Sequence, residues 1–474
     1  MKWVLYNLLF ALVYPFLLPG FLMRMLKRGG YAARMGDRFA LYPDGLFGRD
    51  RPLYDSHAKR VGAGRAAASA DGDFVWIHAV SVGEVQVAGQ LMREWRKAEP
   101  GVRFCFSTTS STGWKIAEKE LRNLNSQPQP STSTSASTSS SDVLIYNPLD
   151  FPNFVKSALR TVRPRAIVLT ESEIWPNFIR QAKKMGVPLF LINARVSDRS
   201  APRYRLARWW FGDVLSSFTR IFAQSDLDKA RLVAAGAPDG IVEVTGSFKF
   251  DVAHRNEAKE KELREWIGPG RILLGGSTWP GEDEVLLKIY QKLLSSSLVP
   301  RPSSLVLVIA PRHFEKADAI EANIKAAGFD CVRRSRGEGH ETRDGRREDA
   351  GAGRVAVYLA DTTGELMGLY GIADVVFVGK SLCAHGSQNM IEPCLCGKPT
   401  FVGPYTENFR PVMSDLLASQ AIVQVKDAAE LEEKVVGCLE DAKGLEGLDA
   451  RAKAAVEKRC GVVARCVKEI REAL

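Results

Sequence analysis

The chain lacks any grouping of residues with the spacing of a metal site. Its six histidines are scattered from His57 to His385. Among eight cysteines the closest pair, Cys394 and Cys396, has one residue between them, whereas zinc and redox motifs have two. We therefore expect no metal, no cofactor and reduced, mostly structural thiols.

Charge is absent near the N-terminus. Trp3 to Met23 contains no charged residue, and an apolar segment of that length can span a bilayer. Basic residues follow at once, so the positive-inside tendency predicts a membrane anchor over residues 1–28 with the rest of the chain in the cytoplasm. A cleaved signal peptide would carry its basic residues on the other side. Pro15, Pro19 and Gly20 also leave an interfacial or re-entrant anchor open.

Length and charge set broad limits. A chain of 474 residues predicts two to four domains. Its formal net charge of +10 should attract anions, whether nucleic acid, phosphorylated sugars or an acidic bilayer. Charge alone does not choose among these partners.

Two series of apolar strands alternate with helical patterns, which predicts two doubly wound α/β domains at 29–248 and 249–474. The second domain should end in helices from residue 428. Residues 125–142 are rich in Ser and Thr and predict a disordered insertion, and residues 333–354 predict a solvated loop. The expected strands are 74–77, 102–107, 143–146, 166–169, 188–192 and 220–223, then 272–274, 305–309, 355–359, 375–378 and 400–402.

The stretch from Phe74 to Gln86 reads FVWIHAVSVGEVQ. Its β-branched and aromatic start, Phe74 to Ile77, predicts a buried strand, and the pattern then breaks at Ser81, Val82 and Gly83. Glu84 then opens a helical pattern that Pro100 stops. Ligands of doubly wound proteins lie outside the carboxyl ends of the strands, so this carboxylate is a candidate site residue. The helix dipole alone also favours an acid at this position.

Two further candidates follow in the first half of the chain. Glu171 comes directly after a predicted strand, although Glu171 or Glu173 could equally well serve only to cap the next helix. Lys249 lies between apolar Phe248 and Phe250 near the predicted domain junction. A lysine there can meet an anion, but isolated lysines are usually solvated.

Three features of the second domain suit an anionic ligand. Pro311 and Arg312 end the strand 305–309, where an arginine can bind phosphate oxygens in a bidentate manner. Residues 362–365 precede a short helical pattern whose free amides can accept an anion or ribose hydroxyls. A glycine-bearing loop after 375–378 leads to a helix start near Asn389. Each signal alone is weak.

Together, six motifs in register resemble the 3-deoxy-D-manno-octulosonic acid (Kdo) transferases of lipopolysaccharide synthesis, over nearly the whole chain to about Arg410. The motifs are His78-Ala-Val-Ser-Val-Gly-Glu84, Glu171-Ser-Glu-Ile-Trp-Pro-Asn177, Asn193-Ala-Arg195, Gly246-Ser-Phe-Lys-Phe-Asp251, Pro311-Arg-His313, and Gly379-Lys-Ser-Leu382 with Asn389-Met-Ile-Glu392.

The resemblance implies a GT-B fold, in which two domains face a cleft, and an inverting, metal-independent glycosyltransferase. Such an enzyme moves Kdo from cytidine monophosphate (CMP)-Kdo to the primary hydroxyl of the distal glucosamine of a lipid A precursor (lipid IVA) and releases CMP. The resemblance also implies that the enzyme acts at the cytoplasmic leaflet of the bacterial inner membrane. The first domain would bind the acceptor, and the second would bind the CMP-sugar. Glu84 would be the base, and Glu171 and Lys249 would stabilise the transition state. The implied CMP contacts are Pro311, Arg312, Thr363, Gly364, Glu365, Asn389, Met390, Ile391 and Glu392.

Two departures from the family pattern are visible. Family members usually read Gly-Gly-Ser-Leu where this chain has residues 379–382, and Gly-Gly-His-Asn where it has residues 386–389. Lys380 adds a cation near the implied site, whereas Gln388 removes an imidazole. Glycine visits positive φ freely, so we expect this loop to bend differently from that of other members and to change donor affinity or rate.

Two other functions fit parts of the pattern. Another two-domain nucleotide-sugar transferase with a different donor would share the fold. A basic protein that binds nucleic acid or an anionic membrane would share the charge, but Glu84, Glu171, Glu365 and Glu392 occupy positions where a polyanion groove needs cations. We therefore expect no nucleic-acid partner.

Overall fold

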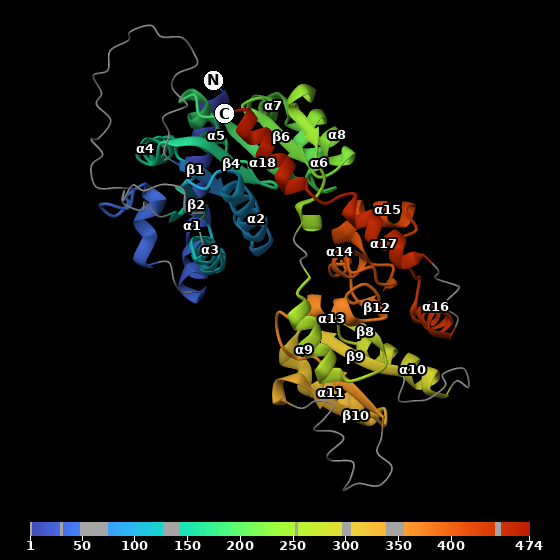
Figure 1. Ribbon diagram of the computed structural model, residues 1–474. Helices are drawn as coiled ribbons and strands as arrows, with labels where there is room; N and C mark the ends of the chain where they lie inside the picture. The colour runs from blue at the N-terminus through green and yellow to red at the C-terminus, as the bar shows by residue number, and fades with distance from the viewer. Residues whose placement is uncertain are drawn as a thin grey trace, which may run out of the picture. The chain divides into compact units, whose positions relative to one another are not determined.

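The computed structural model describes residues 2–28, 32–47, 74–126, 142–251, 255–295, 305–337, 355–440 and 447–474. They form two compact units, drawn in Figure 1. The first contains Met1–Val252 and Gly461–Leu474, and the second contains Ala253–Cys460. Each unit is built on a seven-stranded sheet. Most of the predicted insertion, residues 127–141, lies outside the described residues.

The first sheet has the order β3-β2-β1-β4-β5-β6-β7, and all its neighbours are parallel. Parallel strands covered on both faces need continuous apolar runs, which is why the sequence pattern located most of them. The strand β7, at the edge of the sheet, was not predicted. The strands are β1 (Phe74–His78), β2 (Phe104–Thr108), β3 (Val143–Tyr146), β4 (Pro164–Thr170), β5 (Leu189–Ala194), β6 (Arg220–Ala223) and β7 (Val242–Val244).

Alternate side chains of each strand enter two separate cores. Phe74 and Trp76 of β1 belong to the core under α4, α5, α7 and α8. Val75 and Ile77 belong to the core under α2, α3 and α18. The sheet is therefore buried on both faces, and only its ends are open to a ligand. The helices of this unit are α1 (Lys2–Arg28), α2 (Val82–Ala98), α3 (Ser111–Asn125), α4 (Pro152–Val162), α5 (Pro176–Lys184), α6 (Ala201–Leu206), α7 (Arg208–Leu215), α8 (Asp226–Ala234) and α18 (Val462–Glu472).

The predicted anchor forms the helix α1, and one of its faces packs on the first unit. Trp3 and Tyr6 contact the ring of Trp210, and Phe10 contacts Phe151 at a centroid distance of 5.0 Å. Within the described residues no helix meets the length and hydropathy needed to cross a membrane. The predicted anchor is thus unconfirmed as a span.

The second sheet repeats the arrangement with the order β10-β11-β9-β8-β12-β13-β14. Its strands are β8 (Arg271–Thr278), β9 (Leu305–Pro311), β10 (Asp330–Arg333), β11 (Ala356–Leu359), β12 (Val375–Val378), β13 (Thr400–Val402) and β14 (Val423–Gln424). Its helices are α9 (Glu257–Ile267), α10 (Glu282–Ser295), α11 (Ala317–Ala326), α13 (Leu366–Ile372), α14 (Ile391–Leu395), α15 (Arg410–Ala418), α16 (Ala428–Glu440) and α17 (Leu448–Glu457). The start of the solvated loop expected at 333–354 was wrong, because Arg333 ends β10 and residues 334–336 form a short 3-10 helix. Residues 338–354 of that prediction lie outside the described residues.

The last helix belongs to the first unit, although the sequence pattern placed residues 249–474 in a single second domain. The apolar face of α18 enters the core beside α2 (Figure 1, red helix). Its N-terminal amides find a partner in Asp251, whose carboxylate accepts hydrogen bonds from the N–H groups of Gly461 (2.6 Å) and Val463 (2.7 Å). A carboxylate from a distant segment therefore supplies the cap that Gly461 lacks.

We expect Asp251→Ala to lower the free energy of unfolding of the first unit by about 1–2 kcal/mol, because two N-terminal amides of α18 would lose their acceptor. Urea unfolding measures the change. Asp239→Ala is the control, since Asp239 pairs with Lys229 at the surface and such pairs contribute little. Equal stability of the two variants would contradict the capping role.

Candidate active site

Glu84 lies where β1 ends and α2 begins, and it is nearly buried (8% exposed). Ser81 is the N-cap of α2, and its hydroxyl accepts a hydrogen bond from the N–H of Glu84 (3.3 Å). The Glu84 carboxylate returns the interaction through Oε2, which accepts from the N–H groups of Val80 (2.8 Å) and Ser81 (3.4 Å). The two residues form a capping box, which fixes the carboxylate at the end of the strand.

The capping role occupies only one oxygen of Glu84. The Thr170 hydroxyl, which donates to the carbonyl of His78, also lies 3.4 Å from Oε2. No residue in the described part of the chain donates a hydrogen bond to Oε1. The helix-capping explanation and the catalytic explanation of Glu84 are therefore compatible, because one oxygen caps and the other is available to a substrate proton.

Glu171 follows β4 in the left-handed conformation, with φ of 50°. Its N–H donates to the carbonyl of Ile192 (2.9 Å), and its Oε1 accepts from the side-chain amide of Asn193 (3.2 Å). A non-glycine residue at positive φ carries strain that the surroundings must hold. The turn directs the carboxylate away from the strand and toward Asn193.

Neither acid of this motif caps the helix that follows. α5 begins at Pro176 with Trp175 as N-cap, and no side chain bonds to that cap. Glu173 instead accepts from the indole N–H of Trp175 (2.9 Å), and it lies 3.6 Å from Nε2 of the buried His78. The alternative explanation of Glu171 and Glu173 as helix caps was wrong.

Asn193, at the end of β5, connects Glu171 with the segment that carries Lys249. It is fully buried and has φ of 51°. Its amide donates to Glu171, and its side-chain oxygen accepts from the N–H of Phe248 (3.1 Å). Lys249 is the next residue, in the 3-10 helix η3 (Phe248–Asp251). Sequence reasoning placed Asn193 in a motif but gave it no role, because the hydrogen bonds join segments distant in sequence.

Two cations and two carboxylates interact at this place. Burial raises the pKa of Glu171, and the charge of Glu84 raises it further, whereas Arg195 and Lys249 lower it. Burial lowers the pKa of Lys249, with Arg195 acting in the same direction and Glu171 opposing both. The guanidinium of Arg195 lies 4.0 Å from the Glu171 carboxylate. Perturbed groups of opposite sign beside a sheet end are typical of sites that stabilise changing charge.

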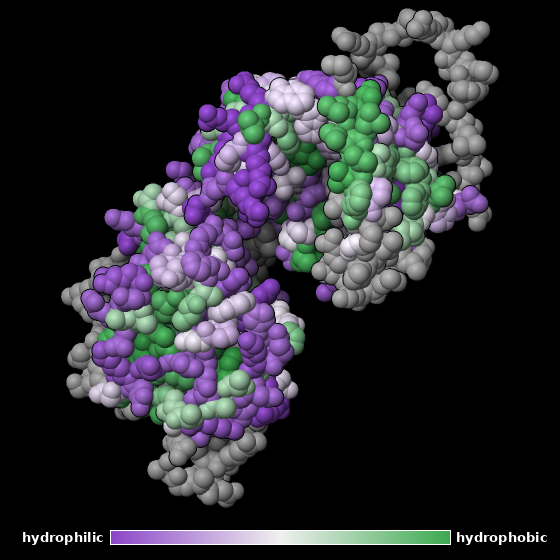
Figure 2. Space-filling model, turned by 180° about the vertical axis from the view of Figure 1, so that it is seen from behind, coloured by the Kyte–Doolittle hydropathy of each residue, from purple (hydrophilic) through white to green (hydrophobic). Residues whose placement is uncertain are grey.

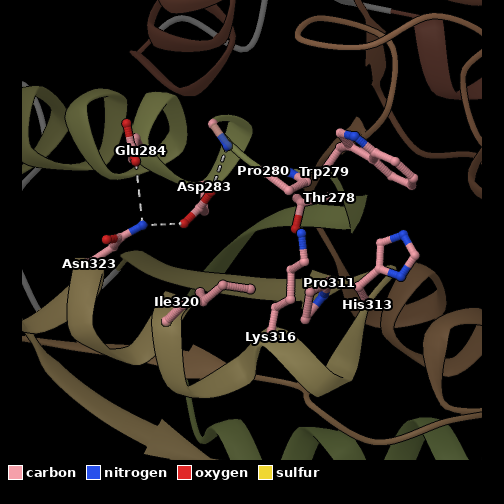
Figure 3. Close-up of a pocket in the computed structure, with 12 residues that line it drawn as sticks. Thr278, Trp279, Pro280, Asp283, Glu284, Pro311, His313, Lys316, Ile320 and Asn323 are labelled. Carbon is pink, nitrogen blue, oxygen red and sulfur yellow. Dashed lines mark hydrogen bonds between the residues drawn. The ribbon is translucent and has the colours of Figure 1, made fainter.

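In the second unit, a pocket of about 230 Å³ lies at the carboxyl ends of β8 and β9 (Figure 3). Pro311, one of the predicted CMP contacts, lines it together with Thr278 and Trp279. The N–H of Arg312 donates to the carbonyl of Thr278 (3.0 Å), which fixes the turn after β9. The pocket therefore adjoins the predicted Pro311-Arg312 motif.

Glu365 follows β11 and immediately precedes α13. Its carboxylate accepts from Lys259 (2.8 Å), from Arg334 (3.0 Å) and from the hydroxyl of Thr362. Although burial opposes ionisation, these hydrogen bonds lower the pKa of Glu365 to about 2. The group is an anion at any physiological pH, so it can accept hydrogen bonds from a ligand's hydroxyls but cannot donate one.

Asn389 and Glu392 occupy the start of α14, after β12. The Asn389 amide donates to Glu392 (3.0 Å), and its oxygen accepts from the N–H of Ile391 (3.1 Å). Burial raises the pKa of Glu392, and the hydrogen bond from Asn389 opposes that rise. Glu84, Glu171 and Lys249 thus lie together in the first unit. The predicted CMP contacts follow β9, β11 and β12 of the second unit, and of these contacts Pro311 is the one that lines the pocket.

The loop between β12 and α14 is held by a residue from another element that the sequence did not single out. Glu282, at the start of α10, is fully buried, and its carboxylate accepts from the N–H groups of Lys380 (2.8 Å), Ser381 (3.1 Å) and Leu382 (3.0 Å). Its position in the first turn of a helix resembled ordinary helix-dipole placement. In the described ranges, no group of three or more His, Cys, Asp or Glu side chains is arranged to hold a metal ion.

Comparison with known proteins tests the family. The model of the 3-deoxy-D-manno-octulosonic-acid transferase domain matches residues 34–252. A 3-deoxy-D-manno-octulosonic acid transferase of Bordetella pertussis is 31% identical over 93% of this chain and 94% of its own length. This chain belongs to the Kdo transferase family. A second transferase of that name, from Haemophilus influenzae, is also 31% identical, over 84% of this chain and 87% of its own.

The Kdo transferase assignment agrees with the fold. The crystal structure of a UDP-GlcNAc 2-epimerase from Neisseria meningitidis superimposes with a TM-score of 0.53, covering 84% of this chain and 98% of that one, at 13% identity. At this identity the likeness concerns the fold alone. The predicted pair of parallel-sheet α/β units, each resembling the units of GT-B glycosyltransferases, is therefore confirmed.

We expect Glu171→Gln to raise the melting temperature at pH 7.5 by about 1–4 °C. The pKa of Glu171 is raised in the folded protein, so its ionised form destabilises the fold above that pKa, and the neutral amide removes this cost. The gain should fade as the pH falls through the raised pKa toward the unfolded value. Differential scanning fluorimetry from pH 4.5 to 8.5 measures it.

Glu118→Gln is the matched control, since Glu118 is half exposed on α3 and pairs only with Arg122 among the described residues. Its effect on melting temperature should be small at every pH. A Glu171→Gln variant whose melting temperature falls at pH 7.5 would show that the carboxylate stabilises the fold.

Proposed function

We propose that this Kdo transferase is an inverting, metal-independent glycosyltransferase that moves Kdo from CMP-Kdo to the primary hydroxyl of the distal glucosamine of lipid IVA and releases CMP. The observation that carries the proposal is the grouping of Glu84, Glu171 and Lys249 at one sheet end. Asn193 fixes Glu171 directly and Lys249 through its neighbour Phe248.

Glu84 acts as the base. A hydroxyl approaching Oε1 meets an oxygen that no described residue occupies, while Oε2 remains bound to the amides of Val80 and Ser81. A carboxylate is by its chemistry a weak base. It suffices if the bond from sugar to phosphate is largely broken first, because the attacking hydroxyl then becomes acidic.

Glu171 and Lys249 stabilise the charges that develop on the donor in the transition state. In the transition state positive charge grows on the ring and negative charge grows on the leaving phosphate. The partly buried carboxylate of Glu171 stabilises the first, and the partly buried ammonium of Lys249 stabilises the second or the donor's own carboxylate. Their mutual interaction in the free protein offsets part of the cost of burying them.

The second unit binds the nucleotide in this proposal. Arg312 binds phosphate oxygens, and the permanently ionised Glu365 accepts from ribose hydroxyls. Residues 363 and 364 and residues 389–392 complete the CMP contacts. The nucleotide leaves as CMP with its phosphate oxygens compensated by these cations and amides.

We expect Glu84→Gln to lose roughly 100- to 10,000-fold in kcat while it retains its affinity for CMP. Glutamine can still accept from the amides of the capping box, so the fold should persist. The assay combines the purified full chain with CMP-Kdo and lipid IVA and measures glycolipid by mass spectrometry. Titration calorimetry with CMP checks donor binding.

Two outcomes would reject the proposal. Equal turnover by the wild type and by Glu84→Gln would show that Glu84 is not the base. Transfer from uridine diphosphate sugars in preference to CMP-Kdo would instead favour another nucleotide-sugar transferase.

We infer, within the same proposal, that the protein associates with the cytoplasmic leaflet of the bacterial inner membrane through the outer face of α1. While Trp3, Tyr6 and Phe10 pack inward, the opposite face is exposed and apolar (Figure 2). A helix with one packed and one apolar exposed face suits burial in the headgroup region. The exposed residues are Val4, Leu5, Leu8, Leu9, Leu12, Val13 and Phe16.

The surface next to this face suits an anionic bilayer. Lys2 bonds to the carbonyl of Trp209 (3.3 Å) and pairs with Asp213, which joins the start of α1 to α7. Leu206 and Trp209 are among the most exposed apolar side chains. Exposed arginines alternate with them at positions 203, 205 and 208. Lipid phosphates attract such arginines, and the acceptor carries phosphates of the same kind.

We expect Leu8→Glu/Leu12→Glu to weaken binding to vesicles of phosphatidylglycerol and phosphatidylcholine by about tenfold or more, because two apolar side chains no longer enter the interface. Co-sedimentation of the full chain measures binding. Leu227→Glu, at an exposed leucine of α8, is the control and should bind as the wild type does. Unchanged binding of the double variant would exclude α1 as the contact.

A further inference from the structure

The loop that follows β12 holds two residues in a conformation that glycine adopts without strain. Lys380 has φ of 56° and Ser387 has φ of 60°. Both stand where members of the family usually have glycine. Side chains at such positions cost free energy, and retained strain at a ligand-binding loop calls for an explanation.

Backbone amides of this loop already donate hydrogen bonds to other parts of the protein. The buried carboxylate of Glu282 accepts from the amides of Lys380, Ser381 and Leu382, and also from Trp279 (2.8 Å). The Gly281 amide donates to Asp283 (3.2 Å). These amides are therefore not available to an anionic ligand, and positive charge from this loop must come from its side chains.

The Lys380 side chain lies beside Trp279, which lines the pocket in the second unit. Its ammonium is 5.0 Å from the centroid of the Trp279 ring, and that ring contacts His313 at 4.6 Å. No carboxylate in the described ranges lies within ion-pair distance of Lys380. A cation on an aromatic face keeps a fixed position while its charge remains free to meet an anion.

The pocket has two unlike ends, which Figure 3 shows. Trp279 and His313 form one end, and Asp283 and Glu284 lie at the other, where both accept from Asn323 (3.0 and 3.5 Å). The acidic end repels an anion and suits hydroxyl groups. An anionic ligand in this pocket is therefore oriented with its charge away from the acidic end, toward Lys316, which also lines the pocket, and toward Trp279 with Lys380 beside its ring.

We propose that Lys380 is a specificity-determining residue that binds an anionic group of the donor at the Trp279 end of this pocket. The inference rests on the proposed function, because the donor CMP-Kdo offers two such groups, the sugar carboxylate and the phosphate. Hydrogen bonds to Glu282 fix the backbone of the loop and so fix the position of Lys380. The neighbouring ring of Trp279 orients the ammonium without neutralising it.

The test measures equilibrium binding of CMP-Kdo and of CMP to the full chain by titration calorimetry without acceptor. We expect Lys380→Met and Lys380→Gly to weaken CMP-Kdo binding about 10- to 100-fold, the range for loss of a hydrogen bond between charged groups. Lys380→Arg should bind within a few-fold of the wild type. Ser387→Gly is the matched control, because it relieves the same kind of backbone strain without removing a charge, and it should bind normally.

The two ligands distinguish the two anionic groups. Loss of CMP-Kdo affinity with unchanged CMP affinity assigns Lys380 to the sugar carboxylate, and equal loss for both assigns it to the phosphate. Equal affinity of wild type and Lys380→Met for both ligands overturns the inference. Failure of the wild type to bind CMP-Kdo would instead reject the proposed function itself.

Discussion

The hydrogen bonds of Asn193 are the constraint on which the first unit's site depends. One side chain at the end of β5 donates to Glu171 and accepts from the backbone beside Lys249. Neither charged group is held by its own strand or helix alone, since Glu171 is in a strained turn and Lys249 is in a single turn of 3-10 helix. A neutral amide can satisfy both hydrogen-bonding partners without adding charge to a site that already contains four charged side chains.

Carboxylates that bind backbone amides recur through the molecule. Glu84, Asp251 and Glu282 each accept from N–H groups at a helix start or in a tight loop. Buried amides without partners are costly, and a carboxylate can satisfy several of them at once. In Glu84 this structural use leaves one oxygen for chemistry, whereas in Glu282 the whole group is occupied by the loop. The same residue type thus has a catalytic role in one proposal and a supporting role in the other.

The sequence predicted the central strands of both sheets, because strands buried on two faces are continuously apolar. It missed β7, β10 and β14, which all lie at a sheet edge, where pairing on only one side leaves a shorter or more polar pattern. It also located the carboxylates at strand ends, since the switch from strand to helix is a local signal. The bridging role of Asn193, the loop held by Glu282 and the placement of α18 depend on contacts between distant segments, which local periodicity does not contain.

The return of α18 to the first unit has a consequence for biosynthesis. The ribosome completes the first sheet early, yet the helix that covers part of its core beside α2 emerges only after the entire second unit. Until then Asp251 has no amides to bind, and apolar side chains of β1 and α2 lack a covering partner. The N-terminal unit therefore acquires its final stability only after the second unit has been synthesised, and part of its apolar surface stays uncovered until then.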